Sequence, residues 1–447
     1  MRPDKRLIYA IAGWFCLAII MVSFRFYYYW KDLETPHYYV EWLCFSALAL
    51  IGILALIDLL NKSFTKHIQA TRNAPGSIAV GVTSSVDITV TNWSDSKIEF
   101  QLFDHYPHQV SSQPIEEHFV LEPNQTINYP YKITAHTRGD GYFGYIQLLV
   151  SSRFKLWQRI INIPSNDIVK IYPNFTQISH FNMLAGEHNL ADMGIHMRQL
   201  RGQGMEFHQL RDYRKGDSLR QIDWSATSRK QKMISKEYQE EKDQQIIFLI
   251  DCGKRMRTKD SELSHFDHSL NALLLLAYVA LKQDDAVGFQ TFGGQNRGIM
   301  PIKGQQQINL LLNKLYDVHP TLTASDYLKA AQELISKTKK RALVVLVSNM
   351  RDDDIPELDP AINLLKKHHL VLLANLKEQH IEKILDQKIK LFSQALNFAE
   401  AKLFLRKRQK LLDYFSAKGV VTIDSTPQQL PAHLVNQYFN IKKSGRL

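Results

Sequence analysis

Acidic, basic and aromatic side chains gather in one short stretch of this chain, LRDYRKGDSLRQIDW, at residues 210–224. Four arginine or lysine residues and three aspartates lie there around a tyrosine and a tryptophan. Carboxylates can serve as general acids, bases or metal ligands, and cations interleaved with aromatic rings can bind single-stranded nucleic acid. The acids and bases to consider, in the stretch and just before it, are Glu206, His208, Asp217 and Asp223.

The spacing of these charges favours a structural network over catalysis. Gly216 is expected to end a turn, and Asp217 to cap a helix that continues through SLRQIDWSATSRK. On that helix Arg220 lies one turn from Asp223 and Trp224, so an ion pair and a cation–π contact are available. We therefore predict that Arg220→Ala and Asp223→Ala mainly destabilise the fold. A hydrolase or metal-dependent enzyme built on the four residues above is the alternative.

Charge and cysteine usage narrow the class of partner and the compartment. The formal net charge is +11 at pH 7, but the aspartates interleaved with the basic residues would repel phosphate, so no nucleic acid is expected as a partner. The same positive charge suits a surface beside anionic lipids. Two of the three cysteines lie in apolar runs and the third, Cys252, follows a predicted buried strand, which agrees with a reducing compartment.

Two uncharged runs near the N-terminus predict a membrane anchor. Residues 7–24 and 42–57 approach the length of a bilayer crossing, and the tyrosines and tryptophans between them suit the headgroup interface. Lysine and arginine are more frequent outside the pair than between the two runs, so the positive-inside rule places both termini in the cytoplasm. We expect a two-pass transmembrane helical hairpin at residues 1–62. A cleaved signal peptide is the alternative for the first run, but no small-residue cleavage site follows it.

The spacing of apolar residues differs between two further regions of the chain. Residues 63–175 contain short segments of alternating apolar residues, such as SSVDITVTNW, which predicts a β-sandwich-like all-β domain. Residues 241–447 contain continuous apolar runs, such as QQIIFLID at 244–251, between helix-patterned stretches. This alternation predicts a doubly wound α/β domain with a parallel sheet. No phosphate-binding loop or nucleophile elbow follows its strands, so no nucleotide hydrolysis is expected.

The segment between these two predicted domains, residues 176–240, resembles the signature of domain-of-unknown-function family 58. The family pattern is approximately G-x-E-F-x-x-L-R-x-Y-x-x-G-D-x-x-R-x-I-D-W-x-A-T-A-R, and this chain reads GMEFHQLRDYRKGDSLRQIDWSATSR. Ser228 stands where the family usually has alanine. The matching residues that could form an interaction surface are Glu206, Arg211, Tyr213, Gly216, Asp217, Arg220, Asp223, Trp224, Thr227 and Arg229.

The resemblance implies an architecture and a class of partner, without an established enzymatic activity. Family members often have two N-terminal membrane segments, a β-rich region, this signature and a von Willebrand factor A-like domain. They are commonly encoded near MoxR-type AAA+ ATPases and other von Willebrand A proteins. The chain is therefore expected to be a non-enzymatic adaptor in the bacterial cytoplasmic (inner) membrane. Its soluble domains would face the cytoplasm, and its process would be envelope-related assembly or stress.

A von Willebrand A-like domain also implies a metal-ion-dependent adhesion site, and this chain is predicted to hold a degenerate one. The usual D-x-S-x-S motif reads Asp251-Cys252-Gly253-Lys254-Arg255, so both serine hydroxyls are missing. Asn349 stands where an aspartate is more frequent, and the remaining threonine is either Thr321 or Thr323. Arg255 would repel a divalent ion if it pointed at the site. Weak or absent Mg²⁺ binding is therefore expected, and no other cofactor is predicted.

Overall fold

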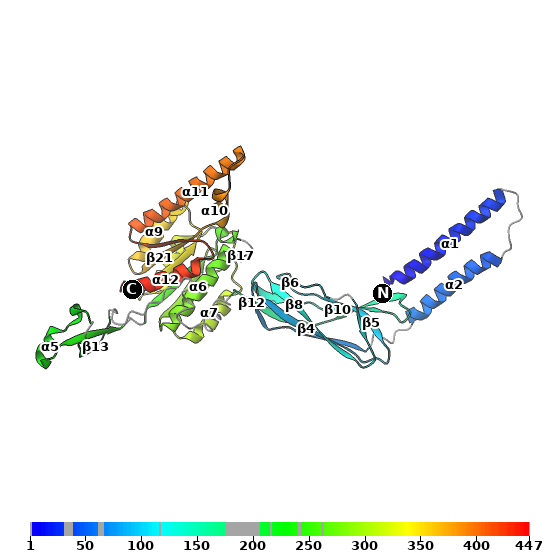
Figure 1. Ribbon diagram of the computed structural model, residues 1–447, viewed down its shortest axis with the longest axis horizontal. Coiled ribbons are helices and arrows are strands. Elements are labelled where there is room, and N and C mark those ends of the chain that lie inside the picture. Colours follow the sequence, from blue (N-terminus) through cyan, green and yellow to red (C-terminus); the bar gives the residue numbers. More distant parts are fainter. Residues whose placement is uncertain are drawn as a thin grey trace. The chain divides into compact units, whose positions relative to one another are not determined.

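The computed structural model describes residues 2–30, 39–60, 67–115, 118–174, 206–214, 217–239, 243–260 and 263–446. The chain divides into two compact units, Met1–Ile171 and Tyr172–Leu447. The first unit contains two helices and a strand-rich body, and the second contains a hairpin and an α/β body (Figure 1). The finer boundaries predicted at residues 62, 175 and 240 stay a prediction.

The N-terminal unit begins with two apolar helices, α1 (Lys5–Trp30) and α2 (Tyr39–Leu60). Within α1, the 23 residues Lys5–Tyr27 are long and apolar enough to cross a membrane. A signal sequence shares these properties. The apolar part of α2 that the structure describes, Cys44–Leu60, is shorter than a typical crossing helix. The two-pass hairpin therefore stays a prediction.

Antiparallel strands form the rest of this unit, with the burial that the alternating sequence predicts. In β4 (Thr83–Asn92), Val86, Ile88 and Val90 are buried and alternate with partly exposed residues. The three sheets have the strand orders β2-β4-β8-β6, β1-β11-β10-β5-β7 and β3-β12-β9. The predicted strand-rich region is confirmed. The other strands are β1 (Arg2–Pro3), β2 (Ile68–Asn73), β3 (Ser77–Ala79), β5 (Ile98–Asp104), β6 (Val110–Ser112), β7 (Phe119–Leu121), β8 (Thr126–Ala135), β9 (Gly139–Tyr142), β10 (Ile146–Ser151), β11 (Trp157–Ile163) and β12 (Ile168–Tyr172).

A buried ion pair that the sequence did not reveal joins two of these sheets. Arg72 of β2 donates Nε to a carboxylate oxygen of Asp104, in β5, at 3.1 Å, and neither side chain is exposed. The guanidinium also donates to Asp167 at 3.1 Å and lies 4.6 Å from the ring centroid of Phe143. Tyr131 donates its hydroxyl to Asp104, and burial raises the pKa of that hydroxyl. The network is closed, because each charge in it has a partner.

A six-stranded sheet forms the core of the C-terminal unit, in the order β19-β18-β15-β20-β21-β22. All of these strands are parallel except β19, which pairs antiparallel with β18 at one edge. Residues along β18 and β20 are buried without alternation, as expected of strands covered on both faces. The strands are β15 (Gln245–Asp251), β18 (Ala286–Phe292), β19 (Gly298–Ile302), β20 (Leu343–Ser348), β21 (Leu370–Leu376) and β22 (Val421–Ser425).

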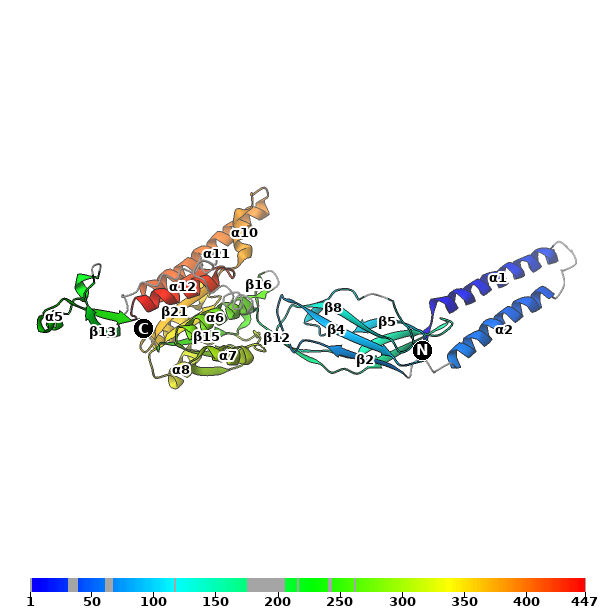
Figure 2. The same ribbon diagram turned by 60° about the horizontal axis from the view of Figure 1, so that its bottom comes forward.

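Helices build a separate hydrophobic core on each face of this sheet (Figures 1 and 2). The predicted α/β region with a parallel sheet is confirmed. One core contains residues of α6 (His265–Lys282), α7 (Ile308–Leu315) and α12 (Leu430–Lys443). The other contains residues of α8 (Tyr327–Lys337), α9 (Ile355–Lys366) and α11 (Phe392–Ala417). The carboxyl ends of the parallel strands meet at one edge of the sheet, which therefore brings together the residues that follow β15, β18 and β20.

Candidate functional site

The signature stretch forms a hairpin, residues 206–239, which we call the arm (Figure 2). Strand β13 (Glu206–Asp212) pairs antiparallel with β14 (Ile234–Gln239). Between them lie a single 3-10 turn, η2 (Leu219–Gln221), and a short helix, α5 (Trp224–Lys230). Of the signature residues, Gly216 lies outside the described part of the chain.

The predicted helix through SLRQIDWSATSRK is wrong in its first half. That half forms η2, after which Ile222 is extended and makes a β-bridge with Ser235 of β14. Ile222 is buried there, so packing against β14 overrides the helical spacing. Helix α5 begins only at Trp224, where the side chain of Asp223 caps it by accepting a hydrogen bond from Ala226 N at 3.0 Å.

Asp217 organises the turn that follows β13. Arg211 donates Nη1 and Nη2 to the two carboxylate oxygens at 2.8 and 2.9 Å, which is a bidentate pair. The carboxylate also accepts Arg214 N at 2.9 Å, and the Tyr213 hydroxyl donates to the Asp217 carbonyl at 3.2 Å. The hydrogen bond from Arg211 is the main cause of the lowered pKa of Asp217. A carboxylate held in this way is a poor general base.

Asp223 and Thr227 fasten α5 to β14. The Asp223 carboxylate lies 3.4 Å from Lys236 Nζ, and its cap of α5 is the main cause of its lowered pKa. The Thr227 hydroxyl accepts Ile234 N at 3.0 Å. Arg220 makes no ion pair or cation–π contact within the described residues, so its predicted pairing with Asp223 is wrong and Lys236 takes that place. We consequently no longer expect Arg220→Ala to destabilise the fold.

Large side chains are left exposed on the arm. Trp224 is 68% exposed and Leu219 is 69% exposed, and Arg220 lies exposed between them in the sequence. Isolated two-stranded hairpins are only marginally stable. Tryptophan and arginine dominate the binding energy of many protein interfaces, so these residues are candidates for contact with a partner. The residues that form the small core of the arm are Ile222, Ala226, Ile234 and Ser235.

The structure describes two of the four side chains of the alternative enzymatic site, Asp217 and Asp223. Both carboxylate oxygens of Asp217 accept hydrogen bonds from Arg211. One oxygen of the Asp223 carboxylate accepts the hydrogen bond that caps α5, and the other lies near Lys236 Nζ. Both acids therefore hold the structure of the arm together, which makes either a poor general base. The side chains of Glu206 and His208 lie outside the described residues.

Acidification is expected to open the arm, because the pKa values of Asp217 and Asp223 are both lowered. Such carboxylates stabilise the fold fully above their unfolded pKa, and the stabilisation is lost as the pH falls through the folded pKa. Amide exchange in β13 and β14, corrected for the intrinsic rate, should be slow at pH 5 and faster below about pH 3. Asp217→Asn should remove part of this dependence. Equal protection at both pH values would contradict it.

A second polar site lies at the carboxyl end of the parallel sheet. Asp251, the last residue of β15, is 1% exposed. Its Oδ1 accepts the Ser325 hydroxyl at 2.5 Å and Gly253 N at 2.7 Å. Its Oδ2 accepts the Ser348 hydroxyl at 2.5 Å and the Tyr327 hydroxyl at 3.4 Å. Burial raises the pKa of Asp251, and these hydrogen bonds oppose the shift.

Ser325 occupies the space that a serine at position 253 would need. A Cβ atom at Gly253 would lie 2.0 Å from the Ser325 hydroxyl oxygen, well inside contact distance. One hydroxyl that the 251–255 motif lacks is therefore supplied from the segment before α8. Ser325 and Ser348 were both missed by the sequence analysis. Ser348 ends β20 at the carboxyl edge of the sheet, and that position was the signal for it, whereas Ser325 lies between α7 and α8 and had no such signal.

The other residues of the predicted metal site make contacts of their own. Arg255 forms a salt bridge with Asp354, and the hydroxyls of Thr321 and Thr323 each lie 2.6 Å from a backbone carbonyl after β18. Asn349 donates its amide to a glutamate after β21 at 3.0 Å, and its Oδ1 is buried without a hydrogen-bond partner among the described residues. No group of three or more His, Cys, Asp or Glu is placed to hold a metal within the described part of the chain. A divalent cation at Asp251 would have to displace the hydrogen bonds that its carboxylate accepts from Ser325, Ser348 and Gly253 N.

Residues 209–390 match the family described as "Protein of unknown function DUF58", which supports the resemblance seen in the signature. No curated protein matches the chain. The chain is also similar to solved structures. They include native alpha-2-macroglobulin from Escherichia coli, with 18% identity over 25% of this chain and 17% of that chain and a TM-score of 0.22. Another is a FixG-related protein from Vibrio parahaemolyticus, with 17% identity over 23% of this chain and 94% of that chain and a TM-score of 0.17.

The human CEP192 PapD-like domain 7 is a third, with 11% identity over 25% of this chain and 88% of that chain and a TM-score of 0.19. The chain thus spans 17% of the length of the alpha-2-macroglobulin structure. TM-scores this low carry no argument about fold or function.

Proposed function

We propose, from the match of residues 209–390 to the DUF58 family and from the geometry of the arm, that this chain is a membrane-anchored interaction protein. The arm docks a cytoplasmic protein. A MoxR-type AAA+ ATPase is the first candidate for this partner, and other von Willebrand A proteins come next. The complex serves envelope-related assembly or stress, and the chain has no enzymatic activity of its own.

The exposed side chains of the arm carry this proposal. Trp224 and Leu219 are both more than two-thirds exposed, and Arg220 has no ion pair within the described residues. Asp217 is paired with Arg211, and Asp223 caps α5 and lies near Lys236, so neither of these carboxylates pairs with Arg220. Exposed apolar side chains beside Arg220 fit a protein partner that has a hydrophobic pocket with acidic residues around it.

The α/β body supports recognition rather than catalysis. A parallel sheet with helices on both faces is the architecture of a von Willebrand A-like domain, which usually binds partners through a cation at this edge of the sheet. Here the Asp251 carboxylate accepts hydrogen bonds from the Ser325 and Ser348 hydroxyls, and Arg255 forms a salt bridge with Asp354. We therefore propose that partner binding by this chain does not depend on a divalent cation.

A two-pass anchor completes the proposal. Both apolar helices are tied to the same strand-rich body, because β1 precedes α1 and pairs with β11, and Asp58 near the end of α2 bonds to Ser152. The helices can therefore enter a bilayer side by side from one end of that body. In this arrangement both termini and the soluble domains lie in the cytoplasm, in agreement with the positive charge outside the pair.

Trp224→Ala is expected to weaken binding of a MoxR-type ATPase from the same organism. Truncation of an interface tryptophan costs about 2 kcal/mol or more, which corresponds to roughly 30-fold in Kd. The affinity would be measured by biolayer interferometry on the full chain in nanodiscs. Tyr142→Ala is the matched control, because Tyr142 is 64% exposed but belongs to the N-terminal unit.

Two further observations would decide an ambiguous result. If Trp224→Ala lost both binding and amide protection in β13 and β14, the variant would have unfolded the arm. Arg220→Glu then replaces it, since Arg220 has no ion pair within the described residues to lose and charge reversal should still weaken an acidic partner. Parent-like affinity in both variants, with the arm intact, would contradict docking by the arm.

A further inference from the structure

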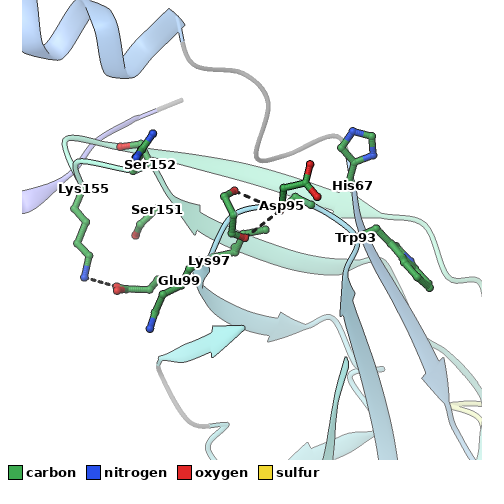
Figure 3. Close-up of a pocket in the computed structure, with 12 residues that line it drawn as sticks. His67, Trp93, Asp95, Lys97, Glu99, Ser151, Ser152 and Lys155 are labelled. Carbon is green, nitrogen blue, oxygen red and sulfur yellow. Dashed lines mark hydrogen bonds and ion pairs between the residues drawn. The ribbon is translucent and has the colours of Figure 1, made fainter. Parts of the chain in front are cut away.

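A pocket of about 770 Å³ opens at one end of the strand-rich body (Figure 3). Its walls come from His67, just before β2, from residues 93–99 in the β4–β5 connection and the start of β5, and from residues between 151 and 155 at the end of β10 and after it. All of these segments belong to the N-terminal unit. Neither the signature nor the Asp251 network contributes to it, so the proposed docking function leaves this pocket unexplained.

The end of α2 is fixed to one wall of the pocket. Asp58, two residues before the end of α2, is 2% exposed and accepts hydrogen bonds from the Ser152 hydroxyl and from Phe154 N, the latter at 3.2 Å. Arg153 lies between these two residues in the chain and lines the pocket, so it is held beside the last turn of α2. A crossing helix leaves the hydrocarbon core at its end, and the pocket therefore lies at the depth of lipid headgroups.

Exposed aromatic rings flank the same place. Trp93 lines the pocket and is 59% exposed, and Phe154, next to Arg153, is 50% exposed. Large exposed rings are costly in water, but tryptophan is enriched at the membrane interface, where an amphipathic ring contacts both headgroups and acyl chains. This position supports a bilayer, rather than bulk water, as the surroundings of the pocket mouth.

Among the described residues of the lining, one arginine and one aspartate have no ion pair. Lys155 forms an ion pair with Glu99, as Figure 3 shows, and Lys97 pairs with a glutamate at 2.7 Å. Arg153 and Asp95 also line the pocket, and neither makes an ion pair within the described residues. A ligand with one anionic and one cationic group would therefore complete the charge pairing, whereas a purely anionic ligand would leave Asp95 unpaired.

We propose that this pocket binds the headgroup of a phospholipid of the phosphatidylethanolamine class, with its phosphate at Arg153 and its primary ammonium at Asp95. Guanidinium–phosphate and ammonium–carboxylate contacts are charge-assisted and are the stronger class of hydrogen bond. The quaternary ammonium of choline has no N–H to donate to Asp95, and a glycerol headgroup has no cation. The inference rests on the proposed membrane anchor and adds the identity of a bound lipid class.

Native mass spectrometry of the full chain would test the lipid class. The chain would be released from nanodiscs with equal parts of dioleoyl phosphatidylethanolamine, phosphatidylglycerol and phosphatidylcholine. The parent should retain the ethanolamine lipid about tenfold over the other two. Arg153→Gln should lose most of this retention, and Asp95→Asn should lose the preference over phosphatidylglycerol. Lys132→Gln should behave like the parent, because Lys132 is an exposed residue of β8 that lies six residues beyond the β8 end nearest Trp93.

The possible results of this experiment distinguish failure of the lipid proposal from failure of the membrane-anchor proposal. Equal retention of the three lipids by the parent, or unchanged retention in both pocket variants, would overturn the lipid proposal alone. Soluble ethanolamine phosphate that bound as tightly as the lipid would assign the pocket to a free metabolite and would also overturn it. A chain that entered none of these bilayers would contradict the anchor and the lipid proposal together.

Discussion

Replacement of Arg72 with alanine is expected to destabilise the strand-rich body by about 3–5 kcal/mol, the usual cost of removing one partner of a buried ion pair. The side chains of Arg72 and Asp104 have no exposed surface, and the variant leaves the Asp104 carboxylate buried with the Tyr131 hydroxyl as a neutral donor. The pair to Asp167 is lost as well. Amide exchange in β4 and β8 of the full chain would measure the free energy of opening.

Two substitutions show whether the effect belongs to the buried pair. Arg72→Lys keeps the charge but cannot make the forked contact with Asp104, so it should fall between the parent and alanine. Lys132→Ala removes an exposed basic side chain from β8 and should change the opening free energy by less than about 0.5 kcal/mol. A loss of less than about 1 kcal/mol in Arg72→Ala would show that the pair is dispensable.

Asp251→Ala is expected to open the carboxyl end of the parallel sheet at a cost of about 3 kcal/mol, because several buried donors lose their acceptor together. The Ser325 and Ser348 hydroxyls and Gly253 N all donate to this carboxylate. Cys252 is the adjacent residue and is buried, so the rate of its labelling reports the opening directly. The other two cysteines would be replaced by serine in every protein compared.

Asp251→Asn distinguishes the loss of an acceptor from the loss of a charge. The amide keeps one acceptor oxygen, and the serine hydroxyls can rotate to accept from it, so less than half of the alanine effect is expected. Burial raises the pKa of Asp251, so its stabilising contribution is largest at low pH and falls as the pH rises through the folded pKa. The advantage of the parent over Asp251→Asn should therefore be larger at pH 5 than at pH 8, after labelling rates are normalised to the unfolded chain. Equal advantages at the two pH values would argue that the carboxylate is ionised throughout this range.

Periodic patterns predicted the secondary structure well where burial is continuous. The alternation of β4 and the apolar runs of β15 and β20 were sufficient to predict a strand-rich region and a parallel sheet, because side-chain period reflects which faces are covered. The helix predicted to begin at Asp217 was wrong, because the spacing of residues does not reveal a contact with a later strand. Ile222 gains more from burial against β14 than from a helical turn, and β14 lies 12 residues further along the chain.

The polar sites were harder to predict, because their members come from distant parts of the sequence. Arg211 and Asp217 are six residues apart and could be linked from local spacing, but Arg72 and Asp104 are 32 apart, and Asp251 and Ser348 are 97 apart. Only the pairing of strands brings such residues together. For the same reason, the cation–π partner chosen for Arg220 was wrong, although its spacing from Trp224 was correct for a helix.

The contact between Gly253 and Ser325 limits how the sequence of this chain can evolve. A serine introduced at 253 would force Ser325 to rotate away from Asp251, because its Cβ atom would lie 2.0 Å from the Ser325 oxygen. Reversion to the D-x-S pattern would therefore be harmful as a first step and tolerable only after Ser325 had become smaller. The two positions are epistatic, and among descendants of this sequence a serine at one should accompany a glycine or alanine at the other.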